Sequence, residues 1–189
     1  MTENELVGFI KKSQREHSDS GILLPDKPTA KIALNLLLNS SSSDIKMLLL
    51  FDENGKNSSL FELIENDIFI KNTIDFLNDS NADFLIVSNK VKTIRKSIFF
   101  KVVSDQVDIK NRLKVRAINE YINNDMKSKG LTNEFVISST NAVLFGDFSF
   151  KSDFEPYLNF NDKSFNQTLC RFFDIASSFD YETSSKAKV

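Results

Sequence analysis

The side chains with the clearest chemical potential are the basic ones between residues 90 and 116. This window holds nine Lys or Arg residues and two acids, a net charge of +7 in a chain whose overall charge is -2. Clustered cations bind phosphate groups well, because neutralising a polyanion releases its counterions. The pattern predicts a phosphate-binding surface for nucleic acid or a nucleotide, formed by Lys90, Lys92, Arg95, Lys96, Arg112, Lys114 and Arg116. The alternative is a solvated helix face that acids from elsewhere in the fold balance.

Nucleophilic and thiolate chemistry has few candidates. The chain has one histidine, His17, and one cysteine, Cys170, 153 positions apart. A Cys/His zinc site, a Cys–His dyad and an internal disulfide are therefore excluded within one chain. Cys170 lies in "LCRFF" on an apolar helix face, which predicts a buried free thiol.

Carboxylates are the remaining candidates for metal chemistry. Six of them are expected near strand ends, where α/β proteins place their sites: Asp44, Asp52, Glu53, Asp83, Asp105 and Asp108. No Asp-x-Asp or Glu-x-Lys pair falls on a predicted strand, as a two-metal nuclease would need. We interpret these acids as solvated or capping residues, and we expect no metal and no cofactor.

The spacing of apolar residues predicts the elements that position these groups. Nearly continuous apolar runs at 45–51, 82–90 and 97–103 predict buried strands. Helices are expected after Pro28, around 69–77, and from Ser104 or Asp105 to Gly130. On that last helix Arg112 and Arg116 would lie one turn apart and share a face.

The C-terminal third predicts a hairpin, a strand and a helix. Residues 133–146 form two short strands about a Ser-Ser-Thr-Asn turn, and "PYLNF" is a further candidate strand. Asp162 is the expected cap of a helix whose apolar residues recur at helical spacing: Phe165, Leu169, Phe172, Phe173 and Ala176. The alternation of helices and strands predicts α/β architecture.

One domain accounts for the length of 189 residues. We expect an N-terminal helix or arm at 1–20, an α/β domain at 21–180 and a polar tail at 181–189. No signal peptide is recognisable, and every apolar run is far shorter than the ~20 residues that span a bilayer. The expectation is a cytoplasmic protein that does not use a membrane.

Three segments, taken in order, resemble the phospholipase D superfamily, in particular its small bacterial phospholipase D-like domains. "KIALNLLLNSSSSDIKMLLLF" is similar to the opening helix and strand, "GLTNEFVISSTNAVLFGDFSF" to the signature hairpin, and "YLNFNDKSFNQTLCRFFDIASSF" to the closing helix. The resemblance implies a mixed β-sheet flanked by helices. In active members a His-x-Lys-x4-Asp motif on the hairpin supplies the nucleophile and neutralises phosphoryl charge.

This chain departs from that motif completely. With Gly146 aligned to the family's Gly-Ser step, the motif positions fall on or within a residue of Asn133, Phe135 and Thr140. None of these is His, Lys or Asp, and His17 lies in the N-terminal arm. The resemblance therefore implies a domain that is not an enzyme.

Our interpretation is a non-catalytic phospholipase D-like recognition or scaffold subunit, in a homodimer or a larger microbial complex. The Phe-rich final helix is a candidate self-association face, with simple burial of its rings as the alternative. The alternative function is nucleic-acid binding, or an atypical nuclease, that uses the basic 90–116 segment.

Overall fold

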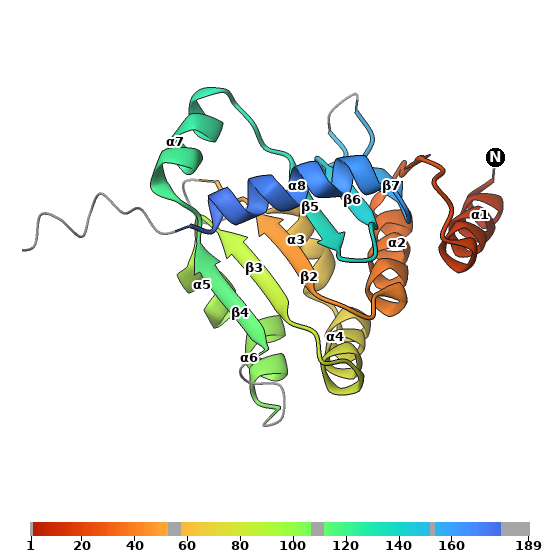
Figure 1. The fold of residues 1–189 in the computed structure, drawn as a ribbon, viewed down its shortest axis with the longest axis horizontal. Helices are drawn as coiled ribbons and strands as arrows, with labels where there is room; N and C mark the ends of the chain where they lie inside the picture. Colours follow the sequence, from red (N-terminus) through yellow and green to blue (C-terminus); the bar gives the residue numbers. More distant parts are fainter. Residues whose placement is uncertain (1, 53–57, 107–111, 152–153, 179–189) are drawn as a thin grey trace, which may run out of the picture.

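A computed structural model of the chain describes residues 2–52, 58–106, 112–151 and 154–178. Its centre is a seven-stranded mixed sheet with the strand order β1-β7-β6-β5-β2-β3-β4 (Figure 1). Strands β2, β3 and β4 run parallel, and β5 enters antiparallel beside β2. The strands are β1 Ile22–Leu23, β2 Ile45–Leu49, β3 Phe84–Ser88, β4 Leu113–Ala117, β5 Glu134–Ser138, β6 Val143–Gly146 and β7 Tyr157–Asn159. The predicted α/β class is confirmed.

Helices cover both faces of this sheet. The helices are α1 Glu3–Glu16, α2 Lys27–Ser40, α3 Ser59–Ile64, α4 Asp67–Asp79, α5 Val91–Lys96, α6 Ile98–Ser104, α7 Glu120–Ser128 and α8 Lys163–Ala176. Helix α8 crosses one face, and α2, α3, α4, α5 and α6 lie on the other, with α1 packed outside α2 (Figure 1). None of the helices within the described ranges is long and apolar enough to cross a membrane.

Two buried clusters hold these layers together. The larger one joins the α2–α6 face to the sheet and includes the rings of Phe69, Phe84 and Phe99, which contact one another in edge-to-face and tilted arrangements. The smaller one lies under α7 and α8, where Phe135 of β5 packs against Phe173 of α8. Burial of this apolar surface is the main stabilising contribution to the fold.

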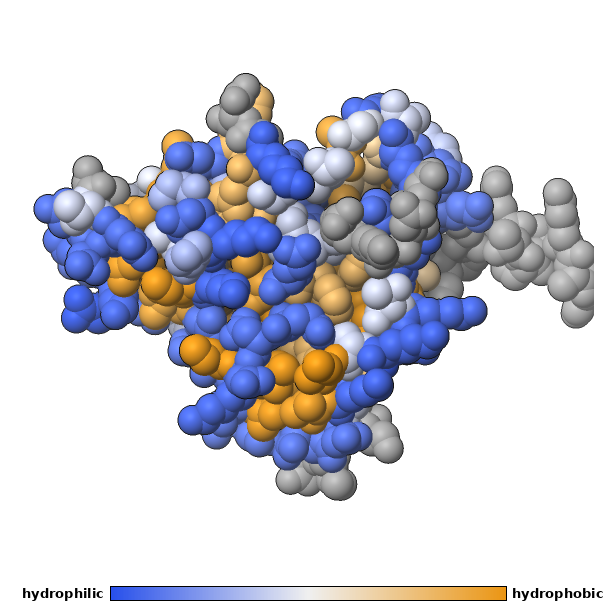
Figure 2. Space-filling model, turned by 180° about the vertical axis from the view of Figure 1, so that it is seen from behind, coloured by the Kyte–Doolittle hydropathy of each residue, from blue (hydrophilic) through white to orange (hydrophobic). Residues whose placement is uncertain are grey.

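The face of the molecule formed by α2–α6 leaves some apolar surface exposed. Figure 2 shows an apolar area among hydrophilic side chains on this side of the molecule. Exposed apolar residues of its helices include Ile68 of α4 and Ile98 and Val102 of α6. The Phe-rich helix α8 behaves differently, because Phe173 is buried and Phe165 is only partly exposed against the sheet. Those rings pack in the core, and homodimer formation stays a prediction.

The strand predicted at 97–103 is wrong, because this segment forms α6. Ser97 caps the helix by accepting a hydrogen bond from the Phe100 N–H at 3.0 Å. Phe99 and Val103, four residues apart, are both buried, whereas Ile98 is exposed. A short, mostly apolar run does not distinguish a strand from a short buried helix.

The long helix predicted from 104 to 130 is also wrong. Residues 113–117 form β4, in which buried Leu113 and Val115 alternate with Lys114 and Arg116. This period of two is the signal of a half-buried strand. Helix α7 then begins after Asn119, whose side chain accepts from the Ile122 N–H, and its predicted end at Gly130 is confirmed by a left-handed φ of 64°.

The hairpin and the final helix lie as predicted. Asn166 of α8 connects them, because its Nδ2 donates to the carbonyls of Ser138 and Ala142 at 2.8 and 3.0 Å. These carbonyls flank the β5–β6 turn, and Asn166 is only 4% exposed. One buried amide therefore holds the closing helix on the hairpin.

We expect Asn166→Asp to lower the free energy of unfolding by about 3 kcal/mol or more, because a carboxylate oxygen would face two carbonyl oxygens in a buried site. Urea unfolding measures this change. Gln167→Glu makes the same amide-to-acid change at an exposed position of α8 and should stay within about 0.5 kcal/mol of the parent. Equal stability of the two variants would contradict the connecting role of Asn166.

Candidate nucleic-acid interface

Helix α5 presents three basic side chains on one face. Lys92, Arg95 and Lys96 are separated by three and four residues, which places them side by side on a helix, and all three are exposed. The buried residue of this helix is Ile94, which packs into the core beneath them. Helix α5 therefore anchors itself with an apolar side and directs its charge outward.

Strand β4 adds to this charge because it is an edge strand and α5 packs against it. Arg95 donates to the Val115 carbonyl at 3.4 Å, and Arg116 is exposed on the strand itself. A hollow of about 510 Å³ runs between them, lined by Arg95, Phe100, Leu113, Lys114, Val115 and Arg116. The fold thus joins two parts of the 90–116 window that are twenty residues apart.

We define the basic surface as Lys92, Arg95, Lys96 and Arg116. Throughout the described part of the chain, none of these four forms an ion pair with an acid. Their charges are therefore available to an external anion.

Three other predicted residues of the window have roles within the fold. The half-buried Arg112 donates to the Ser80 carbonyl, and Lys114 pairs with Asp83. Lys90 is half-buried at the start of α5 and also makes an interaction. Arg112 and Arg116 do not share a helix face, since Arg112 precedes β4 and Arg116 lies within it. Lys110 lies outside the described residues.

The three positions aligned to the phosphodiesterase motif do not form one site. Asn133 precedes β5, Phe135 is buried against α8, and Thr140 lies in the turn after β5, where it hydrogen-bonds Ser138. His17 is an exposed residue in the left-handed conformation that ends α1.

The remaining candidates are dispersed. Cys170 is half-buried on α8, close to Asn166, and burial raises the pKa of its thiol. Asp44 and Asp83 lie at the amino ends of β2 and β3, whereas Asp52 follows the carboxyl end of β2. Within residues 2–52, 58–106, 112–151 and 154–178, no three His, Cys, Asp or Glu side chains come together in a way that could hold a metal ion. Glu53 and Asp108 lie outside the described residues.

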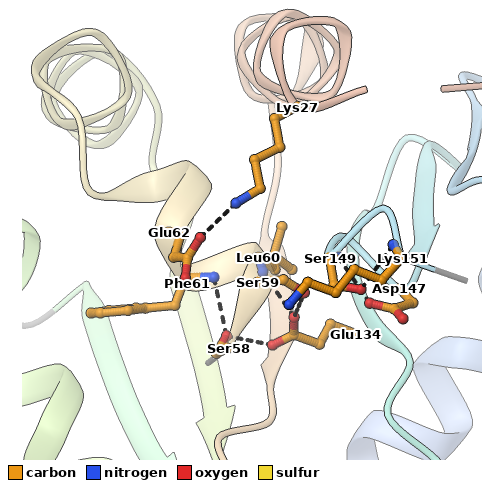
Figure 3. A network of polar contacts seen from close by, with 10 residues as sticks. All are labelled: Lys27, Ser58, Ser59, Leu60, Phe61, Glu62, Glu134, Asp147, Ser149 and Lys151. Carbon is orange, nitrogen blue, oxygen red and sulfur yellow. Dashed lines mark hydrogen bonds and ion pairs between the residues drawn. The ribbon is translucent and has the colours of Figure 1, made fainter. Parts of the chain in front are cut away.

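A buried carboxylate, Glu134, was not predicted from the sequence. It begins β5, is 1% exposed, and points at the start of α3 (Figure 3). Its Oε1 accepts from the Leu50 N–H at 2.9 Å and from the Ser58 hydroxyl at 2.5 Å. Its Oε2 accepts from the Leu60 N–H at 2.8 Å and the Ser59 hydroxyl at 3.2 Å. Glu134 therefore connects β5, the carboxyl end of β2 and the start of α3.

Burial raises the pKa of Glu134 from 4.5 to about 7, and the hydrogen bonds to its oxygens oppose this rise. Between about pH 4.5 and pH 7, the Glu134 carboxyl group is therefore protonated in the folded state and ionised in the unfolded chain. The stability from this proton is complete below about pH 4.5 and is lost as the pH rises through 7.

We expect the unfolding free energy of the parent, relative to Glu134→Gln, to fall by about 3 kcal/mol between about pH 4.5 and pH 8. Urea unfolding of both proteins across this range measures the difference. Asp52, Lys127 and Asp147 lie near Glu134 in the lining of the same cavity, so the comparison with Glu134→Gln isolates the contribution of the Glu134 carboxyl group. A difference that rises with pH would contradict the raised pKa.

Comparisons with known proteins add information about the fold. No protein-family model and no curated protein matches the chain. Among solved structures, the chain is similar to TrmBL2, an archaeal chromatin protein that shows a novel mode of DNA binding. The TM-score is 0.50 at 12% sequence identity, and the likeness covers 91% of this chain and 57% of that one. The chain thus spans just over half of TrmBL2, and at this identity the likeness shows the fold alone.

The class that the fold and the basic surface define is a single α/β domain with a mixed sheet and a cationic edge. The comparisons provide no evidence for a relationship to the phospholipase D superfamily, which stays a prediction together with the absence of enzymatic activity.

Proposed function

We propose that this chain binds duplex nucleic acid, most simply DNA, through the basic surface on α5 and β4. The observation that carries the proposal is the grouping of Lys92, Arg95, Lys96 and Arg116 on one edge without ion pairs to described acids. Such cations gain free energy from phosphate groups because counterions are released on binding. We therefore prefer nucleic-acid binding, the alternative function predicted from the sequence, to the interpretation as a scaffold subunit.

The distribution of aromatic side chains favours a duplex over a single strand. Single-strand binders stack bases on exposed rings beside their cationic groove. The strongly exposed rings in the described ranges are Phe9, Tyr121 and Phe154, and they lie outside α5 and β4. Contacts from the basic surface would therefore be to backbone phosphates, which position a protein without reading sequence.

The fold comparison supports the same function. TrmBL2 is a DNA-binding chromatin protein, and nearly the whole of this chain shares its fold with part of it. The likeness covers 57% of TrmBL2.

Titration of a fluorescein-labelled duplex of about 25 base pairs at several salt concentrations, followed by anisotropy, tests the proposal. With three or four phosphates contacted, log Kd should rise with log salt at a slope of about 3 to 4. A duplex of unrelated sequence should bind with a similar affinity. Absence of saturable binding at about 50 mM salt, or an affinity that salt does not change, would contradict the proposal.

A further inference from the structure

A second site candidate lies away from the basic surface. A cavity of about 500 Å³ opens at the carboxyl ends of β2 and β3, beside the start of β5. Here the strand direction reverses, since β3 is parallel and β5 antiparallel to β2. Ligands of open α/β sheets bind in crevices outside the carboxyl ends of the strands. The cavity also has the size of a small-molecule site.

Polar contacts hold the walls of this cavity in place. Asn89, after β3, accepts from the Phe51 N–H at 2.9 Å and donates to the Phe51 carbonyl at 2.7 Å. Glu134 fixes Leu50 and the first turn of α3, as Figure 3 shows for α3. The positive φ of Gly130 turns the chain after α7, so that Leu131 also lines the cavity. A site whose walls are fixed without a ligand loses little entropy on binding one.

The lining combines an apolar wall with a negative charge. Leu50, Phe51, Met126 and Leu131 contribute the apolar surface. Among the described residues, the charged ones that line the cavity are Asp52, Glu134, Asp147 and Lys127, three acids and one base. The protein uses both oxygens of Glu134 for its own hydrogen bonds, so this residue acts on a ligand through its charge. Asp147 also lines the cavity, and its Oδ1 accepts from the Ser149 N–H at 2.8 Å. A phosphate or carboxylate ligand would be repelled here.

We propose that this cavity binds a small organic cation, a protonated amine carried on an apolar body. The ammonium group lies toward Asp147, and the apolar body packs against the Phe51 and Leu131 side. This ligand differs in charge from the phosphates that the basic surface would bind, so the two sites are separate. The inference does not depend on the proposed function.

Three isosteric probes separate charge from shape: tryptamine is cationic, tryptophol is neutral and indole-3-acetate is anionic. Isothermal titration calorimetry at about pH 8 should give tryptamine a Kd below about 1 mM, at least tenfold tighter than tryptophol, with no measurable binding of indole-3-acetate. Asp147→Asn keeps an acceptor for the Ser149 N–H but removes the charge, and it should weaken tryptamine binding at least about fivefold. Asp75→Asn, at an exposed position on α4, should leave this Kd unchanged.

Equal binding of the three probes, or no binding of any of them, would overturn the proposal. An unchanged Kd in Asp147→Asn would overturn it as well. Charge reversal of Lys92 and Lys96 should not alter tryptamine binding, so failure at the cavity and failure at the basic surface remain distinguishable. Circular dichroism of each variant confirms that its fold is intact before binding is compared.

Discussion

Glu134→Ala is expected to lower the free energy of unfolding by about 3 to 5 kcal/mol, a large part of the total stability of a domain of this size. The substitution removes the acceptor of four hydrogen bonds, two of them from the backbone N–H groups of Leu50 and Leu60. The Leu60 donor is buried and the Leu50 donor is part-buried, and each donor left unsatisfied costs about 1 to 3 kcal/mol. Urea unfolding at about pH 7 measures the loss.

Glu62→Ala is the matched control. Glu62 lies on helix α3, which also carries the Ser59 and Leu60 donors, but its carboxylate is half exposed and pairs with Lys27 at 2.7 Å on the surface. A surface ion pair contributes about 0 to 1 kcal/mol, so this variant should remain close to the parent. Glu134→Gln should fall between the two, because its amide keeps one acceptor oxygen. If Glu134→Ala were as stable as Glu62→Ala, the connecting role of Glu134 would be wrong.

Reversing three charges of the basic surface, Lys92→Glu, Lys96→Glu and Arg116→Glu, should weaken duplex DNA binding at least about a hundredfold at about 100 mM salt. Each substitution removes a cation that faces a phosphate and adds repulsion, and the salt slope should fall by about 0.9 for each phosphate that the variant no longer neutralises. All three residues are exposed, so the fold should be retained. Fluorescence anisotropy with the labelled duplex gives both quantities.

Lys11→Glu, Lys31→Glu and Lys163→Glu form a control with the same change in net charge. These exposed lysines lie on α1, α2 and the first turn of α8, at the other end of the sheet from β4 (Figure 1). We expect less than about a fivefold loss of affinity in this variant. Similar losses in both triple variants would mean that net charge, and not the basic surface, controls binding.

The final helix and the hairpin were predicted correctly from local patterns in the sequence. The apolar residues of α8 recur at helical spacing and Asp162 caps the helix, accepting from the Phe165 N–H at 2.9 Å. The hairpin was predicted because two apolar runs flank a turn of small polar residues, and the turn indeed has Asn141 at a positive φ of 68°. Local chemistry decides these elements.

Tertiary context decided the segments that were predicted wrongly. Residues 112–117 contain three basic residues, as an exposed helix face also could. In the structure the burial of Leu113 and Val115 shows that their alternation with these basic residues belongs to a strand. Similarly, α6 is capped by Ser97 but resembles a strand in the sequence because it is short and mostly apolar.

The candidate sites were predictable in part. The excess of charge in 90–116 identifies the region, but Arg112 and Lys114 are used inside the fold by Ser80 and Asp83, which lie about thirty residues earlier. Glu134 has one visible signal, an acid directly before the apolar run "FVI". Its partners come from segments about 75 to 84 residues away, so no local pattern could have predicted them.

DNA binding by the basic surface is tested most directly by titrating ¹⁵N-labelled protein with an unlabelled duplex of the same length as in the anisotropy experiment. The titration is observed by two-dimensional NMR. We predict that the largest shifts or line broadening occur at Lys92, Arg95, Lys96 and Arg116 on α5 and β4, and that they disappear at high salt. Changes centred on α1 and α2, or a spectrum that the duplex leaves unaltered, would contradict this prediction.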